Sequence, residues 1–381
     1  MDASVEAWET FFSERVRKHQ KLVDGYIAFV KQCLDRGIPP IFEPNHAASL
    51  MGLLSNELGF LESGAQARYR HFRVSKKLGG EREIKSPMPM LLQAQRWILD
   101  NILYKVDVSE DCYGGVRQGS IFRNAAVHLN QNAVLKLDIV DFFGSVKLAR
   151  GINLFKSLGY PYNVAKTLAL LCFDEGSLPQ GAATSPMIAN IVSKPMDNRL
   201  KGLATKYSLN YSRYFDDMTF SGSHINMRFV EIVSQIVQES GFAINANKTK
   251  LIFGRSPKYV TGLSIGGETL RLPRADKREI RNQAFQLVRR GVEKHSEAIE
   301  DSDPLLIEKT IGRVSFWLQA EPECKMALKL MEELRSYQKS FQTPTDLPVP
   351  RRAMPLEDKR AQKDEMPASP PQGVPGPLRP A

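Results

Sequence analysis

The sequence predicts an α+β fold in which an antiparallel sheet carries an acidic site and helical segments flank it. Two observations predict the sheet. Asp216-Asp217 lies in an apolar, aromatic-rich segment typical of a buried β-hairpin, and the apolar run from Val134 ends in Asp138. A third observation, apolar residues at helical spacing near both ends of the chain, predicts the helices. Strand interiors rarely hold acids without a reason, so these acids are candidate functional groups.

Residues 1–65 are expected to form a helical extension. Trp8, Phe11 and Phe12 recur at helical spacing, the apolar face continues to Cys33, and the segment 37–40 (Gly-Ile-Pro-Pro) ends it. We interpret this extension as a layer that packs on the rest of the protein, with partner binding as the alternative.

A β pattern begins near Arg68 and turns at Gly79-Gly80, and residues 91–99 then have the pattern of an amphipathic helix. The loop 178–186 (Leu-Pro-Gln-Gly-Ala-Ala-Thr-Ser-Pro) follows the first acidic strand and leads into a helix-like run, Met187 to Val192. These segments alternate with the acidic ones along the chain.

The three acids are expected to meet at a metal site. Adjacent carboxylates cannot all ionise cheaply without a counter-charge, and a divalent cation is the usual one. If the strand of Asp138 pairs beside the Asp216-Asp217 hairpin, the three side chains converge on two Mg²⁺ ions, for which Mn²⁺ can substitute. This arrangement is typical of phosphoryl transfer.

These segments resemble the A, B and C motifs of reverse transcriptases in order and spacing, and residues 76–84 (Lys-Lys-Leu-Gly-Gly-Glu-Arg-Glu-Ile) resemble the preceding fingers motif. Two further matches are to bacterial retron reverse transcriptases: residues 124–128 (Asn-Ala-Ala-Val-His) resemble their NAxxH motif and residues 260–262 their VTG motif. The resemblance covers roughly residues 40 to 340. Phe215 is a departure, because the retron enzymes commonly have Ala there.

The resemblance implies a right-hand polymerase fold, with fingers and palm over residues 66–270 and a helical thumb over 271–341. It also implies a metal site formed by the three acids and the Ile139 carbonyl. Phe143 matches a steric gate that excludes the ribose 2′-hydroxyl, so the product would be DNA; its alternative is a core residue. Phe142 fits less well, because strand alternation would place it on the opposite face.

The resemblance further places the incoming nucleotide. Gln180 and Gly181 match the loop that cradles it, with Gly181 permitting close backbone approach. Lys77 and Arg82 match residues that clamp the triphosphate, with Lys76 as an alternative to Lys77. Lys248 matches a lysine that protonates the pyrophosphate leaving group, and an ordinary surface lysine is the alternative.

Two sets of residues are expected to contact nucleic acid. Asn124 and His128, spaced i and i+4, are candidates for reading structured RNA, with a satisfied buried histidine as the alternative. After Pro273, a helix would bury Ile280, Ala284, Leu287 and Val288. Its basic stripe, which is either a phosphate-binding face or a solvated one, consists of Arg274, Lys277, Arg278 and Arg281.

Composition agrees with a nucleic-acid partner. The net charge is +10, and residues 342–381 carry six basic and five acidic side chains, so +9 belongs to the rest of the chain. This Pro-rich tail is expected to be disordered. The four scattered cysteines favour neither zinc nor disulfides. Neither a secretory signal nor a membrane-length apolar run appears, so no membrane partner and a cytoplasmic location are expected.

The resemblance implies an RNA-directed DNA polymerase that converts part of a cognate noncoding RNA into a branched RNA-linked DNA in antiphage defence. Its expected partners are that RNA, the RNA-DNA product, dNTPs, an effector or toxin protein and a host RNase H. Alternatives are another defence-associated or group II intron-like reverse transcriptase, or a catalytically silent RNA-binding scaffold.

Overall fold

The computed structural model describes residues 5–15, 19–63, 68–75, 80–291, 303 and 305–340. The Pro-rich segment 342–381 and Lys76, Lys77 and Gly79 lie outside the described residues, so the predictions on them stay predictions.

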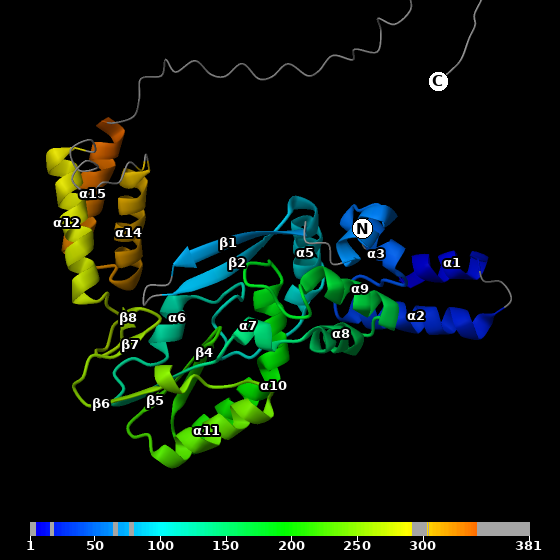
Figure 1. The fold of residues 1–381 in the computed structure, drawn as a ribbon, viewed down its shortest axis with the longest axis horizontal. Helices are drawn as coiled ribbons and strands as arrows, with labels where there is room; N and C mark the ends of the chain where they lie inside the picture. Colours follow the sequence, from blue (N-terminus) through cyan, green and yellow to red (C-terminus); the bar gives the residue numbers. More distant parts are fainter. Residues whose placement is uncertain are drawn as a thin grey trace, which may run out of the picture.

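A four-stranded antiparallel sheet forms the centre of the molecule (Figure 1). Its strands are β3 (Ala133–Asp138), β4 (Asn210–Tyr214), β5 (Asp217–Gly222) and β6 (Lys250–Phe253), in the order β4-β5-β3-β6. β3 is a central strand and is buried along almost all its length, which explains its continuous apolar run. Helix α10 (Ser185–Lys206) packs against β4, and α11 (Met227–Glu239) packs against α10. The predicted α+β class, with an antiparallel sheet that carries the acids, is confirmed.

A two-stranded ribbon of β1 (Tyr69–Ser75) and β2 (Glu81–Pro87) extends over this sheet (Figure 1). Gly80 has a φ of +84°, as a turn into β2 requires. The ribbon joins a helical layer built from α5 (Pro89–Asn101), α8 (Leu148–Ser157) and α9 (Tyr162–Cys172). The short helices η2 (Leu103–Lys105) and α6 (Ile121–Ala126) then lead into β3.

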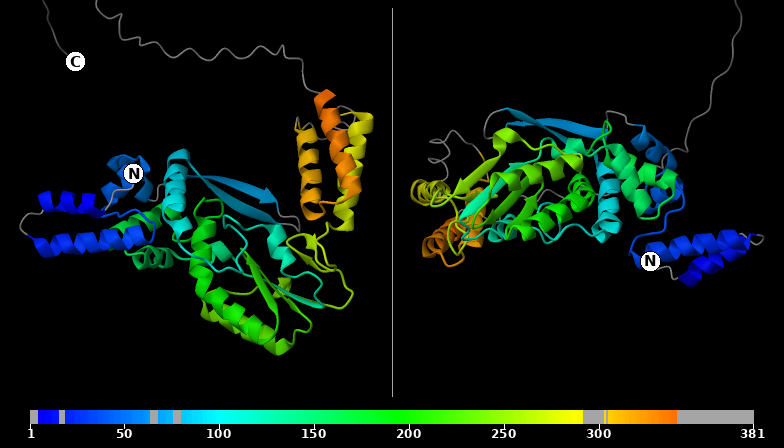
Figure 2. Two further views of the ribbon diagram at one scale, coloured as in Figure 1. Left: turned by 180° about the vertical axis from the view of Figure 1, so that it is seen from behind. Right: turned by 90° about the horizontal axis from the view of Figure 1, so that it is seen from below.

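Among the described residues, four helices precede the ribbon: α1 (Val5–Arg15), α2 (Gln20–Asp35), α3 (Pro44–Met51) and α4 (Ser55–Glu62). As predicted, the second of them ends just before Gly37. Phe12 and the buried face of α2 form a separate small core, which Trp8 and Phe42 border. The α1–α2 pair projects from one end of the molecule (Figure 2).

A helical bundle, described through three of its helices, stands at the opposite end of the molecule (Figures 1 and 2). It includes α12 (Arg274–Arg290), α14 (Leu306–Ala320) and α15 (Lys325–Ser340). Ile280, Ala284 and Leu287 are buried in its core, as their spacing predicts. The bundle follows the hairpin of β7 (Tyr259–Val260) and β8 (Leu263–Ser264). None of the helices in the described ranges combines the length and apolar character that a membrane crossing needs.

Candidate active site

The fold brings the predicted acids to one edge of the sheet. Asp138 and Asp217 are directly opposite each other in the β3–β5 pair, and Asp216 lies in the two-residue turn between β4 and β5. The Ile139 backbone N–H donates to the Asp216 carbonyl at 2.9 Å, which ties the turn to the end of β3. A cavity of about 850 Å³ opens here, between the sheet and the β1–β2 ribbon. Its lining includes Arg82, Asp138, Ile139, Phe143, Gln180, Gly181, Asp216 and Lys248.

The acids form an electrostatically unfavourable group. Burial, then the Asp217 and Asp138 carboxylates, raise the pKa of Asp216. Burial also raises the pKa of Asp217, with Asp138 adding to the shift and Lys136 opposing it. A cation would relieve this repulsion.

Lys248 supplies one positive charge to this group. Its Nζ donates to both carboxylate oxygens of Asp138, at 2.8 and 3.0 Å, and the hydrogen bond to Asp138 raises the lysine pKa. The short helix η3 (Ala246–Lys248) brings the lysine there, and the Asn245 N–H anchors its start on the Asp138 carbonyl at 2.8 Å. Lys248 thus lies against the site and is not an isolated surface lysine.

In the described part of the chain, no three carboxylate, imidazole or thiol groups are arranged closely enough to hold a metal ion as they stand. The donor chemistry nevertheless fits a hard divalent cation, because the single Lys248 ammonium only partly balances three clustered carboxylates, whose oxygens are the ligands that such a cation prefers.

A buried ion pair supports the Phe215-Asp216 turn, and sequence reasoning missed it. Arg213 and Asp197 are fully buried and form two hydrogen bonds, Nε to Oδ1 at 2.8 Å and Nη2 to Oδ2 at 2.7 Å. The same guanidinium donates to the Phe215 carbonyl at 3.0 Å and to Asn190 Oδ1 at 3.1 Å. An arginine in an otherwise buried strand was the available signal, since such a charge needs a partner.

Phe215, the departure noted above, has a φ of +55°, which is costly for a side chain of this size. Its ring and backbone lie against Gly114 and Gly115. A Cβ added at Gly114 would come 2.8 Å from the Phe215 nitrogen, so the glycine makes room for the turn. The hydrogen bond from the Arg213 guanidinium to the Phe215 carbonyl helps to hold the strained turn in place.

Phe143 lies beside the cavity, half-buried, and its ring centroid is 6.1 Å from that of Phe215. The expectation that Phe142 and Phe143 continue a strand is wrong. The chain leaves the strand at Asp138, Asp141 has a φ of +43°, and both rings belong to the short helix α7 (Phe142–Ser145). Phe142 is buried because of this helical turn and not because of strand alternation.

Asn124 and His128 do not reach the surface, so the expectation that they contact RNA directly is wrong for this conformation. His128 is fully buried, and its ring nitrogens are each 2.7 Å from a serine hydroxyl, those of Ser212 and Ser221. Burial lowers its pKa to about 3. The alternative, a satisfied buried histidine, is confirmed.

The segments that resemble the NAxxH motif (124–128) and the VTG motif (260–262) are neighbours in space. Thr261 and Gly262 both have positive φ, +45° and +83°, and form the tight turn between β7 and β8. The Thr261 hydroxyl donates to the Ile121 carbonyl at the start of α6, at 3.0 Å, and α6 carries Asn124. The β7–β8 turn is thus tied to α6, and Ala125 of α6 packs in the same hydrophobic core as the helical bundle.

The basic stripe of α12 is reduced from four residues to three. Arg274, Arg278 and Arg281 are exposed. Lys277 is half-buried instead and its Nζ is 2.6 Å from Glu321, so the expectation that it faces phosphate is wrong. Its ion pair joins α12 to the end of α14.

Residues 74–282 match the family model described as reverse transcriptase (RNA-dependent DNA polymerase). The chain is 37% identical over 252 residues to retron Mx65 reverse transcriptase of Myxococcus xanthus, over 60% of this chain and 59% of that one. It is 34% identical over 248 residues to retron Ec86 reverse transcriptase of Escherichia coli, over 64% of this chain and 77% of that one. The chain therefore spans less than two thirds of the first relative and about three quarters of the second. The solved structure of telomerase from Candida albicans, in complex with a fragment of telomeric RNA, aligns over 70% of this chain and 63% of that chain, with 9% identity and a TM-score of 0.42.

The family match also confirms the right-hand polymerase fold. The division expected from the sequence would make the β1–β2 ribbon part of the fingers, the four-stranded sheet part of the palm and the helical bundle the thumb, and this division stays a prediction. Because the family model matches more than half of the chain and the Ec86 alignment covers most of that relative, this chain belongs to the bacterial retron reverse transcriptases, a family of RNA-directed DNA polymerases.

Proposed function

We propose that the protein reverse transcribes part of a cognate structured noncoding RNA, starting from a 2′-hydroxyl within that RNA, and so makes a branched RNA-linked DNA for antiphage defence. The observation that carries the polymerase activity is the single cavity that Asp138, Asp216 and the Gln180-Gly181 loop share. The relatives named as retron enzymes favour the retron type over an intron-like one.

In this proposal, two Mg²⁺ ions, or Mn²⁺, would be held by Asp138, Asp216 and Asp217 with the Ile139 carbonyl. Bound there, they would supply activation of the attacking hydroxyl and stabilisation of the leaving pyrophosphate. The location of Lys248 beside Asp138 supports its role as the proton donor to pyrophosphate, because its ammonium already lies at the acid cluster.

The other groups bind and select the nucleotide. Arg82 and Lys77 clamp the triphosphate, the Gln180-Gly181 loop cradles the nucleotide, and Phe143 fills the space that a ribose 2′-hydroxyl needs. Arg82, Gln180, Gly181 and Phe143 line the one cavity, which supports these roles. The proposed partners are the cognate RNA, its RNA-DNA product, dNTPs, an effector or toxin protein, and a host RNase H that removes the copied template.

We expect the double substitution Asp216→Ala, Asp217→Ala to abolish Mg²⁺-dependent DNA synthesis and to leave RNA affinity largely intact, because phosphate binding comes from basic side chains elsewhere. Primer extension on a primed RNA and fluorescence anisotropy with the same RNA measure the two properties.

The matched control is Asp24→Ala, Asp35→Ala, which removes the same charge from the exposed surface of α2. This control should extend the primer like the wild type. Extension at near wild-type rate by the Asp216, Asp217 variant would contradict the catalytic assignment and favour the silent scaffold.

A further inference from the structure

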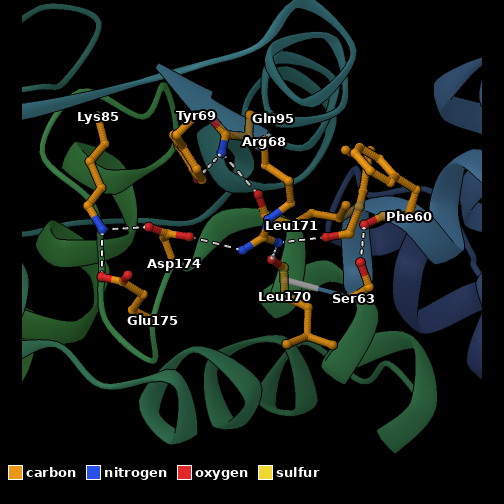
Figure 3. Close-up of polar contacts among 11 residues, drawn as sticks. Phe60, Ser63, Arg68, Tyr69, Lys85, Gln95, Leu170, Leu171, Asp174 and Glu175 are labelled. Carbon is orange, nitrogen blue, oxygen red and sulfur yellow. Dashed lines mark hydrogen bonds and ion pairs between the residues drawn. The ribbon is translucent and has the colours of Figure 1, made fainter. Parts of the chain in front are cut away.

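A chain of ion pairs connects the fingers to the loop of the nucleotide cradle (Figure 3). The Asp174 carboxylate accepts from Arg68 Nη2 at 3.0 Å through one oxygen and from Lys85 Nζ at 2.7 Å through the other. Arg68 is only 4% exposed, and its other Nη atom donates to the Leu61 carbonyl at 2.6 Å. Lys85 also donates to Glu175 Oε2 at 2.7 Å. Two cations and two carboxylates thus balance one another, and Lys85 and Asp174 among them line the cavity.

Lys85 holds both ends of the segment 174–181. Its side chain binds Asp174 and Glu175 at the start of the segment, while its backbone N–H donates to the Gln180 carbonyl at the end, at 2.7 Å. The backbones approach so closely there that a Cβ added at Gly181, where φ is +116°, would lie 2.7 Å from the Lys85 carbonyl oxygen. One residue of β2 therefore anchors both ends of the loop that leads to the predicted cradle, while the Leu148 N–H holds its middle through the Gly176 carbonyl at 2.9 Å.

The start of this loop has an unusual backbone conformation. Glu175 has a φ of +48° and Gly176 a φ of +77°, in a tight turn in which Asp174 and Ser177 exchange backbone hydrogen bonds. A non-glycine residue with positive φ is uncommon, and such strain persists where surrounding contacts fix it. The contacts here include the ion pair of Glu175 with Lys85 and the hydrogen bond from the Leu148 N–H to the Gly176 carbonyl at 2.9 Å.

We infer that Lys85 and Asp174 are positioning residues that set the Gln180-Gly181 cradle relative to the fingers ribbon, so that the incoming nucleotide meets both in register. This inference rests on the proposed polymerase function. Lys85 also lines the cavity, and direct binding of the triphosphate is the competing role. The geometry favours positioning, because the Lys85 side chain is 14% exposed and has two carboxylate partners.

The first test is single-nucleotide incorporation by Lys85→Met on a primed RNA. Misplacing the cradle should raise the KM for dNTP about tenfold and change kcat much less, because productive geometry is lost mainly in nucleotide binding. Lys85→Arg keeps the charge and should restore KM to within about threefold of the wild type. The control Arg73→Gln breaks an exposed ion pair with Glu81 on the same ribbon and should leave KM unchanged. A merely structural lysine would lower the melting temperature without this split between KM and kcat.

The second test separates positioning from direct phosphate binding. Asp174→Asn should raise KM as Lys85→Met does, and the double variant should be no worse than either single one, because the two residues act as a unit. If Lys85 binds the triphosphate, Asp174→Asn would free its ammonium and lower KM or leave it unchanged, which would overturn the inference.

Asp174→Asn removes the carboxylate partner of Arg68 and could prevent folding, so a third variant is needed. Glu175→Gln alters a side chain that is 76% exposed, and it should raise KM by about two- to threefold because Lys85 then has one charge partner fewer. If the wild type is active and KM is unchanged in both Lys85→Met and Glu175→Gln, the positioning inference is overturned and the proposed polymerase function stands. An inactive wild type would instead contradict the proposed function.

Discussion

The ring of Phe143 is the single side chain to which we assign selection of the nucleotide sugar. Phe143 lies in a helical turn. Its ring packs against Phe215 on one side and borders the cavity on the other. We expect Phe143→Val to allow ribonucleotide incorporation with a smaller reduction of deoxynucleotide addition, because discrimination by shape needs close contact. Single-nucleotide kinetics with matched dNTP and NTP on one primed RNA measure this. An unaltered preference would mean that Phe143 is only a core residue.

His128 makes folding stability depend on pH. Its pKa is about 3 in the folded protein and near 6.5 in the unfolded chain, so the unfolded state binds more protons between these values and stability falls as pH falls below about 6.5. Between pH 7 and pH 5 we expect the wild type to lose about 2 kcal/mol more than His128→Gln. Urea unfolding of both proteins at the two pH values provides the comparison, and equal losses would show that His128 titrates normally.

At the scale of elements, helix α12 carries basic residues of two kinds, those exposed to solvent and one held in an ion pair. Arg274, Arg278 and Arg281 are exposed, whereas Lys277 binds Glu321. Replacing the three arginines with Gln should make the slope of log affinity against log salt shallower, by about 0.7 to 0.9 for each phosphate that is no longer neutralised. Lys277→Gln is the internal control: it should lower stability and leave the slope unchanged. An unchanged slope in the triple variant would restore the solvated-face interpretation.

Elements with a local signal were predictable from the sequence. The apolar run ending in Asp138, the aromatic hairpin around Asp216 and the helical spacing after Pro273 each form the predicted element. The error at Phe142 and Phe143 has a cause that no local pattern reveals. The apolar pattern continues past Asp138, and so does part of the pairing, because Ile139 forms an antiparallel bridge with Ile244 and the Val140 N–H donates to the Ala243 carbonyl at 2.8 Å. The positive φ of Asp141 then turns the chain into α7. Ile244 and Ala243 come from a segment that is distant in the sequence.

At the scale of the whole molecule, the convergence of the acids on one cavity followed from family resemblance together with antiparallel pairing. The supporting ion pairs did not follow from the sequence. Arg68 and Asp174 are separated by 106 positions, and no periodicity links them. The pair Arg213 and Asp197 joins a strand to a helix that precedes it, and only the burial of both charges shows that they belong together.

The ion pairs at Asp174 also limit how this enzyme can be recombined with its relatives. The fingers ribbon and the cradle loop are far apart in the gene, yet they share one charge-balanced cluster. A chimera could take residues 68–87 from a relative that lacks cations at the positions of Arg68 and Lys85. Its Asp174 carboxylate would then have lost both of its ion-pair partners. Segments 68–87 and 170–185 therefore have to be exchanged together, although α5, β3 and α8 lie between them along the chain.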